Sequence, residues 1–95
     1  MIDDGREALQ RRIVPELEEL WPVMKKLDAV RQHVLMDMAF SMGVKGLLAM
    51  QRFVAAVELH FWRTAAEEML ISQWANGDKG RATGMAVMML TGRSD

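Results

Sequence analysis

The sequence predicts an all-α protein, and three observations indicate this class. Apolar residues recur at spacings of three and four along most of the chain, which is the period of an amphipathic helix. No stretch alternates apolar and polar residues with a period of two, and no hairpin turn lies between β-branched runs. The segment 28–42 is apolar on nearly every side in its second half, which is typical of a helix enclosed by others. We therefore expect about six helices packed around a central buried helix at about 28–42.

Length and composition restrict the protein to one domain, residues 1–95, which can bury one hydrophobic core. Thirteen acidic and twelve basic residues give a net charge of −1, so we expect neither nucleic acid nor a membrane as a partner. No run reaches the roughly 20 apolar residues that span a bilayer, and the acidic start MIDDG does not resemble a signal peptide. We expect a chain that is cytoplasmic as synthesised.

Residues 6–27 carry apolar residues at helical spacing, but two prolines interrupt the pattern. Pro15 should kink or restart a helix, because it lacks an N–H and clashes with the preceding turn. Pro22 should lie in the first turn of a short helix. The apolar stripe of this segment comprises Leu9, Ile13, Leu17, Leu20, Trp21, Met24 and Leu27.

The central helix should begin after Asp28, whose carboxylate can cap the free N–H groups, and end at Gly43 with a left-handed exit. Its side chains expected to meet water are Arg31, Gln32 and His33. Asp37 is a carboxylate in the most apolar part of the helix, so it must be paired, hydrogen-bonded or protonated. We favour a satisfied structural role for Asp37, and a functional role remains the alternative.

The second half of the chain should form three further helices and a turn. One helical turn is expected at 47–50, followed by a helix over 51–61 and another from Trp62 to Leu70. The apolar face of the helix over 51–61 comprises Phe53, Val54, Val57 and Phe61. Residues 72–77 are expected to form a turn, because Asn76-Gly77 readily takes positive φ. Asp78 should cap a last helix that ends at Gly92.

Candidate chemistry is sparse. The chain has no cysteine, and His33 and His60 lack a second ligand at i+3 or i+4, so we expect no metal site and no cofactor. Trp74, Asn76 and Arg81 offer an aromatic ring, an amide and a guanidinium, which could line a sugar-binding edge. The simpler interpretation is a core Trp, a turn Asn and a surface Arg.

Four segments follow one another along the chain: LDAVRQHVLMDMAFSMG, FWRTAAEEM, SQWANGDKGRA and a final helix that ends in LTG. In this order they resemble the C-terminal helical lobe of bacteriophage lysozymes of the T-even type. The resemblance covers residues 27–92 as a core lobe. More loosely, residues 1–26 are similar to the helix that joins the two lobes of that family.

The resemblance implies substrate contacts but no catalytic residues. The family's catalytic glutamate and its aspartate and threonine partners lie in an N-terminal lobe that has no counterpart here. The positions that match the family's peptidoglycan cleft are Phe40, Ser41, Trp74, Asn76 and Arg81. Ser41 stands where the family often has a longer amide side chain.

We therefore expect a lysozyme-like phage or prophage protein related to peptidoglycan degradation and host lysis, with no catalytic activity on its own. Peptidoglycan glycan is the expected partner. One alternative is a helical interaction or self-association module, and another is an active muramidase that uses Asp37. Because the missing lobe would leave the stripe of the first segment uncovered, we also expect a homodimer built on residues 6–24.

Overall fold

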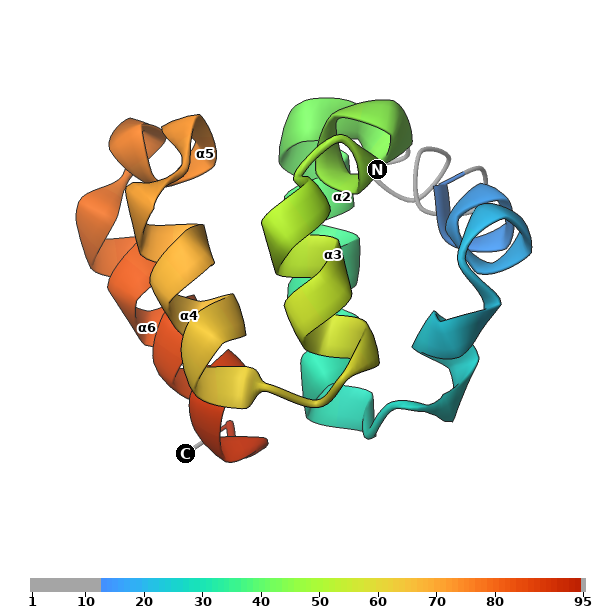
Figure 1. Ribbon diagram of the computed structural model, residues 1–95. Helices are drawn as coiled ribbons and strands as arrows, with labels where there is room; N and C mark the ends of the chain where they lie inside the picture. Colours follow the sequence, from blue (N-terminus) through green and yellow to red (C-terminus); the bar gives the residue numbers. More distant parts are fainter. Residues whose placement is uncertain (1–12, 95) are drawn as a thin grey trace, which may run out of the picture.

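The computed structural model describes residues 13–94, and these form an all-helical protein (Figure 1). Residues 13–20 are helical, and six elements follow. They are η1 (Pro22–Lys26), α2 (Ala29–Leu48), α3 (Gln51–Glu58), α4 (Trp62–Ile71), α5 (Gln73–Gly77) and α6 (Lys79–Thr91). In Figure 1, α2 and α3 lie between residues 13–26 on one side and α4, α5 and α6 on the other. The described residues contain no strand, so the predicted all-α class is confirmed.

None of the helices in the range 13–94 is by itself long and apolar enough to cross a membrane. Only α2 and α3 taken together meet the criterion of length and composition, and these two helices meet at an angle of 99°.

The first segment packs onto the rest of the chain more closely than expected. Pro22 occupies the first turn of η1, as predicted. Leu17, Trp21 and Met24 are at most 3% exposed, and the Trp21 indole N–H donates to Glu58 Oε2 on α3 at 2.8 Å. Their stripe therefore faces the protein's own core, and the prediction that it is left uncovered is wrong for these three residues. Leu9 lies outside the described residues.

The central helix α2 begins as predicted and continues further. Asp28 caps it, because Asp28 Oδ2 accepts a hydrogen bond from the Arg31 N–H at 3.0 Å. Gly43 has the expected positive φ of 82°, but its ψ of 158° is extended, so the chain kinks there and helical structure resumes to Leu48. The predicted left-handed end at Gly43 and the separate turn at 47–50 are therefore wrong. The buried face of α2 comprises Val34, Leu35, Asp37, Met38, Ala39, Val44 and Leu47.

Helix α3 is shorter than the periodicity indicated. It ends at Glu58, and His60 takes a left-handed φ of 61°, so the helical progression does not reach Phe61. Phe53 and Val57 are fully buried as expected, whereas Phe61 is 57% exposed. Placing Phe61 on the apolar face was wrong, because α3 ends three residues before it.

Helices α4 and α6 run side by side, and α5 joins them (Figure 1). The expected turn at 72–77 is wrong, because Gln73–Gly77 forms a short helix and neither Asn76 nor Gly77 takes a positive φ. Asp78 caps α6 as predicted, since Asp78 Oδ1 accepts from the Arg81 N–H at 3.0 Å. Gly92 ends α6 in the left-handed conformation, with φ 72° and ψ 19°, also as predicted.

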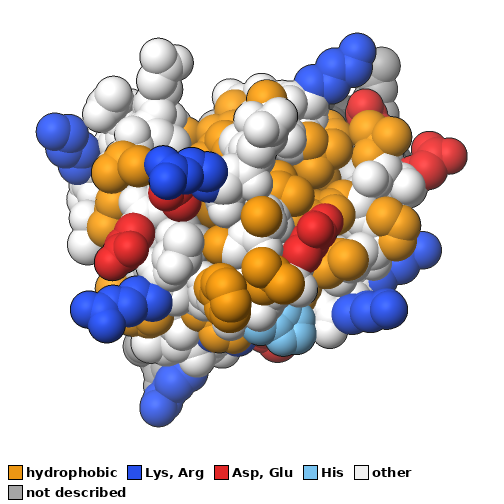
Figure 2. Space-filling view, in the orientation of Figure 1, with side chains coloured by type: hydrophobic (Ala, Val, Ile, Leu, Met, Phe, Trp, Pro, Cys, Tyr) orange, Lys and Arg blue, Asp and Glu red, His pale blue; other side chains and the backbone are white. Residues whose placement is uncertain are grey.

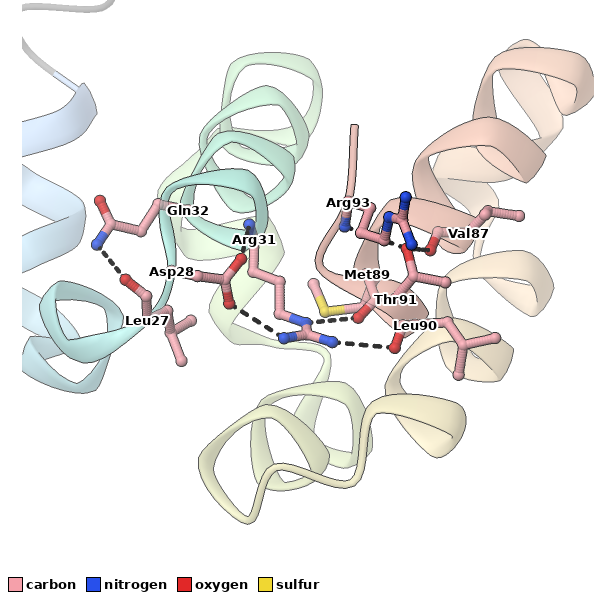
Figure 3. A network of polar contacts seen from close by, with 9 residues as sticks. All are labelled: Leu27, Asp28, Arg31, Gln32, Val87, Met89, Leu90, Thr91 and Arg93. Atoms are coloured by element: carbon pink, nitrogen blue, oxygen red, sulfur yellow. Dashed lines mark hydrogen bonds and ion pairs between the residues drawn. The ribbon is translucent and has the colours of Figure 1, made fainter. Parts of the chain in front are cut away.

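Arg31 links the beginning of α2 to the end of α6 (Figure 3). Its Nε donates to the Met89 carbonyl at 2.6 Å and its Nη2 to the Leu90 carbonyl at 2.9 Å. These carbonyls lie in the last turn of α6, where the helix itself supplies no partner and a cation is favoured. Nη1 contacts Asp28 Oδ1 at 3.1 Å, and the guanidinium carbon lies 3.9 Å from the centroid of the Trp62 ring. Arg31 was expected to meet water, but its side chain is only 12% exposed.

Candidate functional site

A pocket of about 400 Å³ opens between α2 and the α5–α6 corner. Figure 2 shows the upper edge of the molecule indented between these two groups of helices. The walls of the pocket come from segments that are more than 30 residues apart in the sequence, so the pocket exists only in the folded chain. The lining residues are Ser41, Met42, Gln73, Trp74, Gly77, Asp78, Arg81 and Ala82.

The α2 wall ends where the helix kinks. Ser41 is exposed, and its hydroxyl donates to the Asp37 carbonyl one turn earlier at 3.2 Å. Met42 is half-buried and precedes the Gly43 kink directly. The hydroxyl of Ser41 therefore lies at the edge of the pocket, and its oxygen can still accept a hydrogen bond from a ligand.

The opposite wall combines an aromatic ring with polar groups. Trp74 is half-buried on α5, and Gln73 beside it is exposed. Asp78 directly precedes α6, and its carboxylate caps that helix. This wall therefore presents one aromatic surface and one primary amide to a ligand.

An ion pair joins the two walls. Arg81 on α6 donates through Nη2 to Asp37 Oδ1 on α2. The Asp37 side chain is only 6% exposed, whereas that of Arg81 is 48% exposed. A buried carboxylate requires such a partner, so the interpretation of Asp37 as a satisfied structural group is supported. A guanidinium has five N–H donors, so the exposed part of Arg81 can also face a ligand oxygen.

The structure brings together three of the five residues singled out in the sequence. Ser41, Trp74 and Arg81 all line the pocket, whereas Phe40 and Asn76 do not. Phe40 is half-buried and Asn76 is exposed beside the pocket. The sequence reasoning missed Met42, Gln73, Gly77, Asp78 and Ala82. Each of these residues is adjacent in sequence to a residue that was singled out, or lies within one helical turn of it. This closeness in sequence is the signal that could have indicated them.

The groups in the pocket suit binding better than acid–base chemistry. An aromatic face, an amide, a hydroxyl and a guanidinium are the groups that orient a polar ligand in a partly apolar site. The one carboxylate among the lining residues is Asp78, which caps α6. Within residues 13–94 there is also no group of three or more His, Cys, Asp or Glu side chains that could hold a metal ion.

The fold is consistent with an all-α, lysozyme-like lobe, and comparisons with known proteins support a lysozyme-like relationship. The chain is 30% identical over 70 residues to the probable T4-type lysozyme 1 of Dictyostelium discoideum, covering 74% of this chain and 41% of that protein. It is 31% identical over 85 residues to the pre-baseplate central spike protein Gp5 of Enterobacteria phage T4, covering 90% of this chain and 15% of that protein. The chain therefore spans less than half of either relative. It matches no protein-family model.

Proposed function

We propose that this chain binds the glycan strands of peptidoglycan in the pocket between α2 and α5–α6, and that it does not cleave them by itself. The observation that carries the proposal is the convergence of Ser41, Trp74 and Arg81 on one pocket. The likeness to a T4-type lysozyme supports a role connected with peptidoglycan.

The pocket has the size and chemistry that a sugar requires. Its volume of about 400 Å³ lies within the usual range for ligand sites, and the pocket is open to solvent. The apolar face of a sugar ring can stack on Trp74, while its hydroxyl and acetamide groups exchange hydrogen bonds with Gln73 and Ser41. The exposed part of Arg81 can donate to a carbonyl or carboxylate oxygen of the strand.

Cleavage requires an arrangement that the pocket does not present. Glycosidases place two carboxyl groups about 5 to 9.5 Å apart on either side of the scissile bond. The Asp78 carboxylate caps α6 by accepting the Arg81 N–H. Asp37 is buried, is paired with Arg81, and does not line the pocket. This geometry supports a binding role and disfavours the alternative of a muramidase that uses Asp37.

Sedimentation with insoluble peptidoglycan tests binding directly. Gln73→Ala removes an exposed amide at the first position of α5, and Gln51→Ala removes another exposed amide at the first position of α3, outside the pocket. We expect Gln73→Ala to weaken binding about fivefold, as the loss of one hydrogen bond does, and Gln51→Ala to bind as the native chain. Equal effects of the two substitutions, or no sedimentation of the native chain, would contradict the proposal.

Clearing of permeabilised Gram-negative cells tests the second half of the proposal. The native chain should bind the cell wall without reducing turbidity. Clearing that Asp37→Asn abolishes would establish an active muramidase instead.

A second candidate function, a self-association module, is favoured by one specific observation. Leu70, Val87 and Leu90 on α4 and α6 remain 45–50% exposed, although most large apolar side chains of the described residues are buried. A homodimer through residues 6–24 also stays a prediction, but the burial of Leu17, Trp21 and Met24 removes much of its apolar surface.

A further inference from the structure

We infer that Asp37 determines which part of a glycan strand the proposed pocket prefers, because it holds and neutralises Arg81. The pocket should take the uncharged, N-acetylated groups of the strand in preference to its carboxylate groups. This inference rests on the proposed function, since it names the groups that the same site recognises. The residues that carry it are Asp37 on α2 and Arg81 and Asp78 on the opposite wall.

Asp37 holds the Arg81 side chain from the buried side of the ion pair. The Asp37 side chain is 6% exposed, and Met38 and Ala39 beside it on α2 are fully buried, so its carboxylate is fixed by the packing of the core. Arg81 donates to this carboxylate through Nη2 and lines the pocket with a side chain that is 48% exposed. A guanidinium that is already bonded at one end loses less rotamer freedom when a ligand binds. Asp37 is therefore a positioning residue that acts on the ligand through Arg81.

The same ion pair removes the positive charge that an anionic ligand would need. Among the described residues that line the pocket, Arg81 is the one cation, and Asp78 contributes a carboxylate to the lining. One guanidinium with the two carboxylates of Asp37 and Asp78 leaves the site with a formal charge of −1. An approaching carboxylate therefore meets no net attraction at this site.

Other positive groups near the two walls do not change this balance. The first N–H groups of α6 favour negative charge, but Asp78 already caps them through the Arg81 N–H. Lys45 on α2 and Lys79 on α6 are exposed and are not among the lining residues, so water and salt screen their charges.

A neutral sugar ring bearing an acetamide suits what remains. Trp74 offers an aromatic face, Gln73 an amide, and Arg81 the N–H groups that Asp37 does not use. The acetamide carbonyl is an uncharged acceptor, so it can bond to these donors without the cost of removing a carboxylate from water.

A pair of ligands that differ only in charge tests the inference. A soluble tetrasaccharide of alternating N-acetylglucosamine and N-acetylmuramic acid carries lactyl carboxylates, and methyl esterification makes the same tetrasaccharide neutral. NMR titrations that follow the Trp74 indole N–H give the dissociation constant of each form. The native chain should bind the ester about two- to fivefold more tightly than the acid, the size of effect that one solvent-screened unit charge produces.

Three substitutions identify the source of this preference. Asp37→Asn should shift the ratio of the two dissociation constants by about threefold or more towards the acid, because Arg81 is then no longer neutralised. Asp78→Asn keeps a side chain that caps helices well and should shift the ratio in the same direction. Glu67→Gln removes the same charge from an exposed position on α4, outside the pocket, and should leave the ratio unchanged. Circular dichroism checks that each variant keeps its helical content.

The ratio separates a role in specificity from a purely structural role of Asp37, which would weaken the binding of both forms equally. Equal or tighter binding of the acid by the native chain would overturn the inference and leave the proposed glycan site in place. A ratio unchanged by Asp37→Asn in a folded variant, or moved as far by Glu67→Gln, would also overturn it. A native chain that binds neither form would instead contradict the proposed function itself, and the inference with it.

Discussion

Replacing Arg31 with alanine should reduce the free energy of unfolding by about 3 kcal/mol. The side chain supplies two hydrogen bonds from a charged group to the last turn of α6, each of which stabilises by about 1 kcal/mol where water can partly replace it. Its position over Trp62 contributes about 0.5 to 1 kcal/mol, and the ion pair with the exposed Asp28 contributes less than about 1 kcal/mol. A domain of this length has only about 5 to 14 kcal/mol of total stability, so the loss should be easy to measure.

Thermal and urea unfolding followed by circular dichroism provide the assay. A loss of this size should lower the melting temperature by about 12 to 24 °C. Arg31→Lys should recover about half of the loss, because an ammonium keeps the charge but cannot donate to two carbonyls from a planar fork. Arg52→Ala removes an exposed arginine from α3 and should change stability by less than about 0.5 kcal/mol.

Two outcomes would refute this reasoning. An Arg31→Ala protein that melts within about 3 °C of the native chain would mean that the contacts with α6 contribute no net stability. A lysine variant as stable as the native chain would mean that Arg31 acts only as a point charge at the helix end.

Three further predictions follow from single residues. Met38 is fully buried, so Met38→Asp should cost about 4 kcal/mol or more and leave a chain without a cooperative urea transition. Gly92→Ala should cost about 1 to 2 kcal/mol, because the φ of Gly92 is +72° and the new Cβ would lie 2.9 Å from Arg31 Nη1. The control Gly84→Ala, whose new Cβ would meet nothing within 4 Å, should stabilise α6 by about 0.5 to 1 kcal/mol. Burial raises the pKa of Asp28, but the hydrogen bonds and charge of Arg31 lower it more, so its pKa lies below the ordinary value of 3.8. A carboxyl group with a lowered pKa in the folded state stabilises the protein at pH values above its ordinary pKa, and this stabilisation is lost as the pH falls through the folded pKa. The melting temperatures of the native chain and of Asp28→Asn should therefore differ at pH 6 and converge as the pH falls well below the ordinary value of 3.8.

Local signals in the sequence predicted most helix boundaries, because caps and prolines act within one turn. Asp28 and Asp78 cap the helices that follow them, and Pro22 lies in the first turn of η1, all as the sequence indicated. Gly43 shows the limit of such signals. A glycine permits positive φ, but the structure that follows it depends on packing, and here the chain resumes a helix.

Long-range contacts were the part of the fold that the sequence could not provide. Nothing in the spacing of Arg31 indicates that it reaches the carbonyls of α6, nearly 60 residues later. The sequence also did not indicate that Asp37 pairs with Arg81, although it did indicate that a buried Asp37 needs a partner. Composition alone does not indicate the pocket. The resemblance to phage lysozymes suggested the residue Ser41 on its α2 wall.

The most direct test of the proposed glycan site is an NMR titration of the tryptophan indole N–H signals with a soluble peptidoglycan oligosaccharide. The chain has three tryptophans, and only Trp74 lines the pocket. Trp21 is buried with its N–H bonded to Glu58, and Trp62 lies under Arg31, so both serve as internal controls. We predict a saturable shift of the Trp74 signal while the signals of Trp21 and Trp62 stay in place. An unmoved Trp74 signal at saturating glycan, or equal shifts of all three signals, would contradict the proposal.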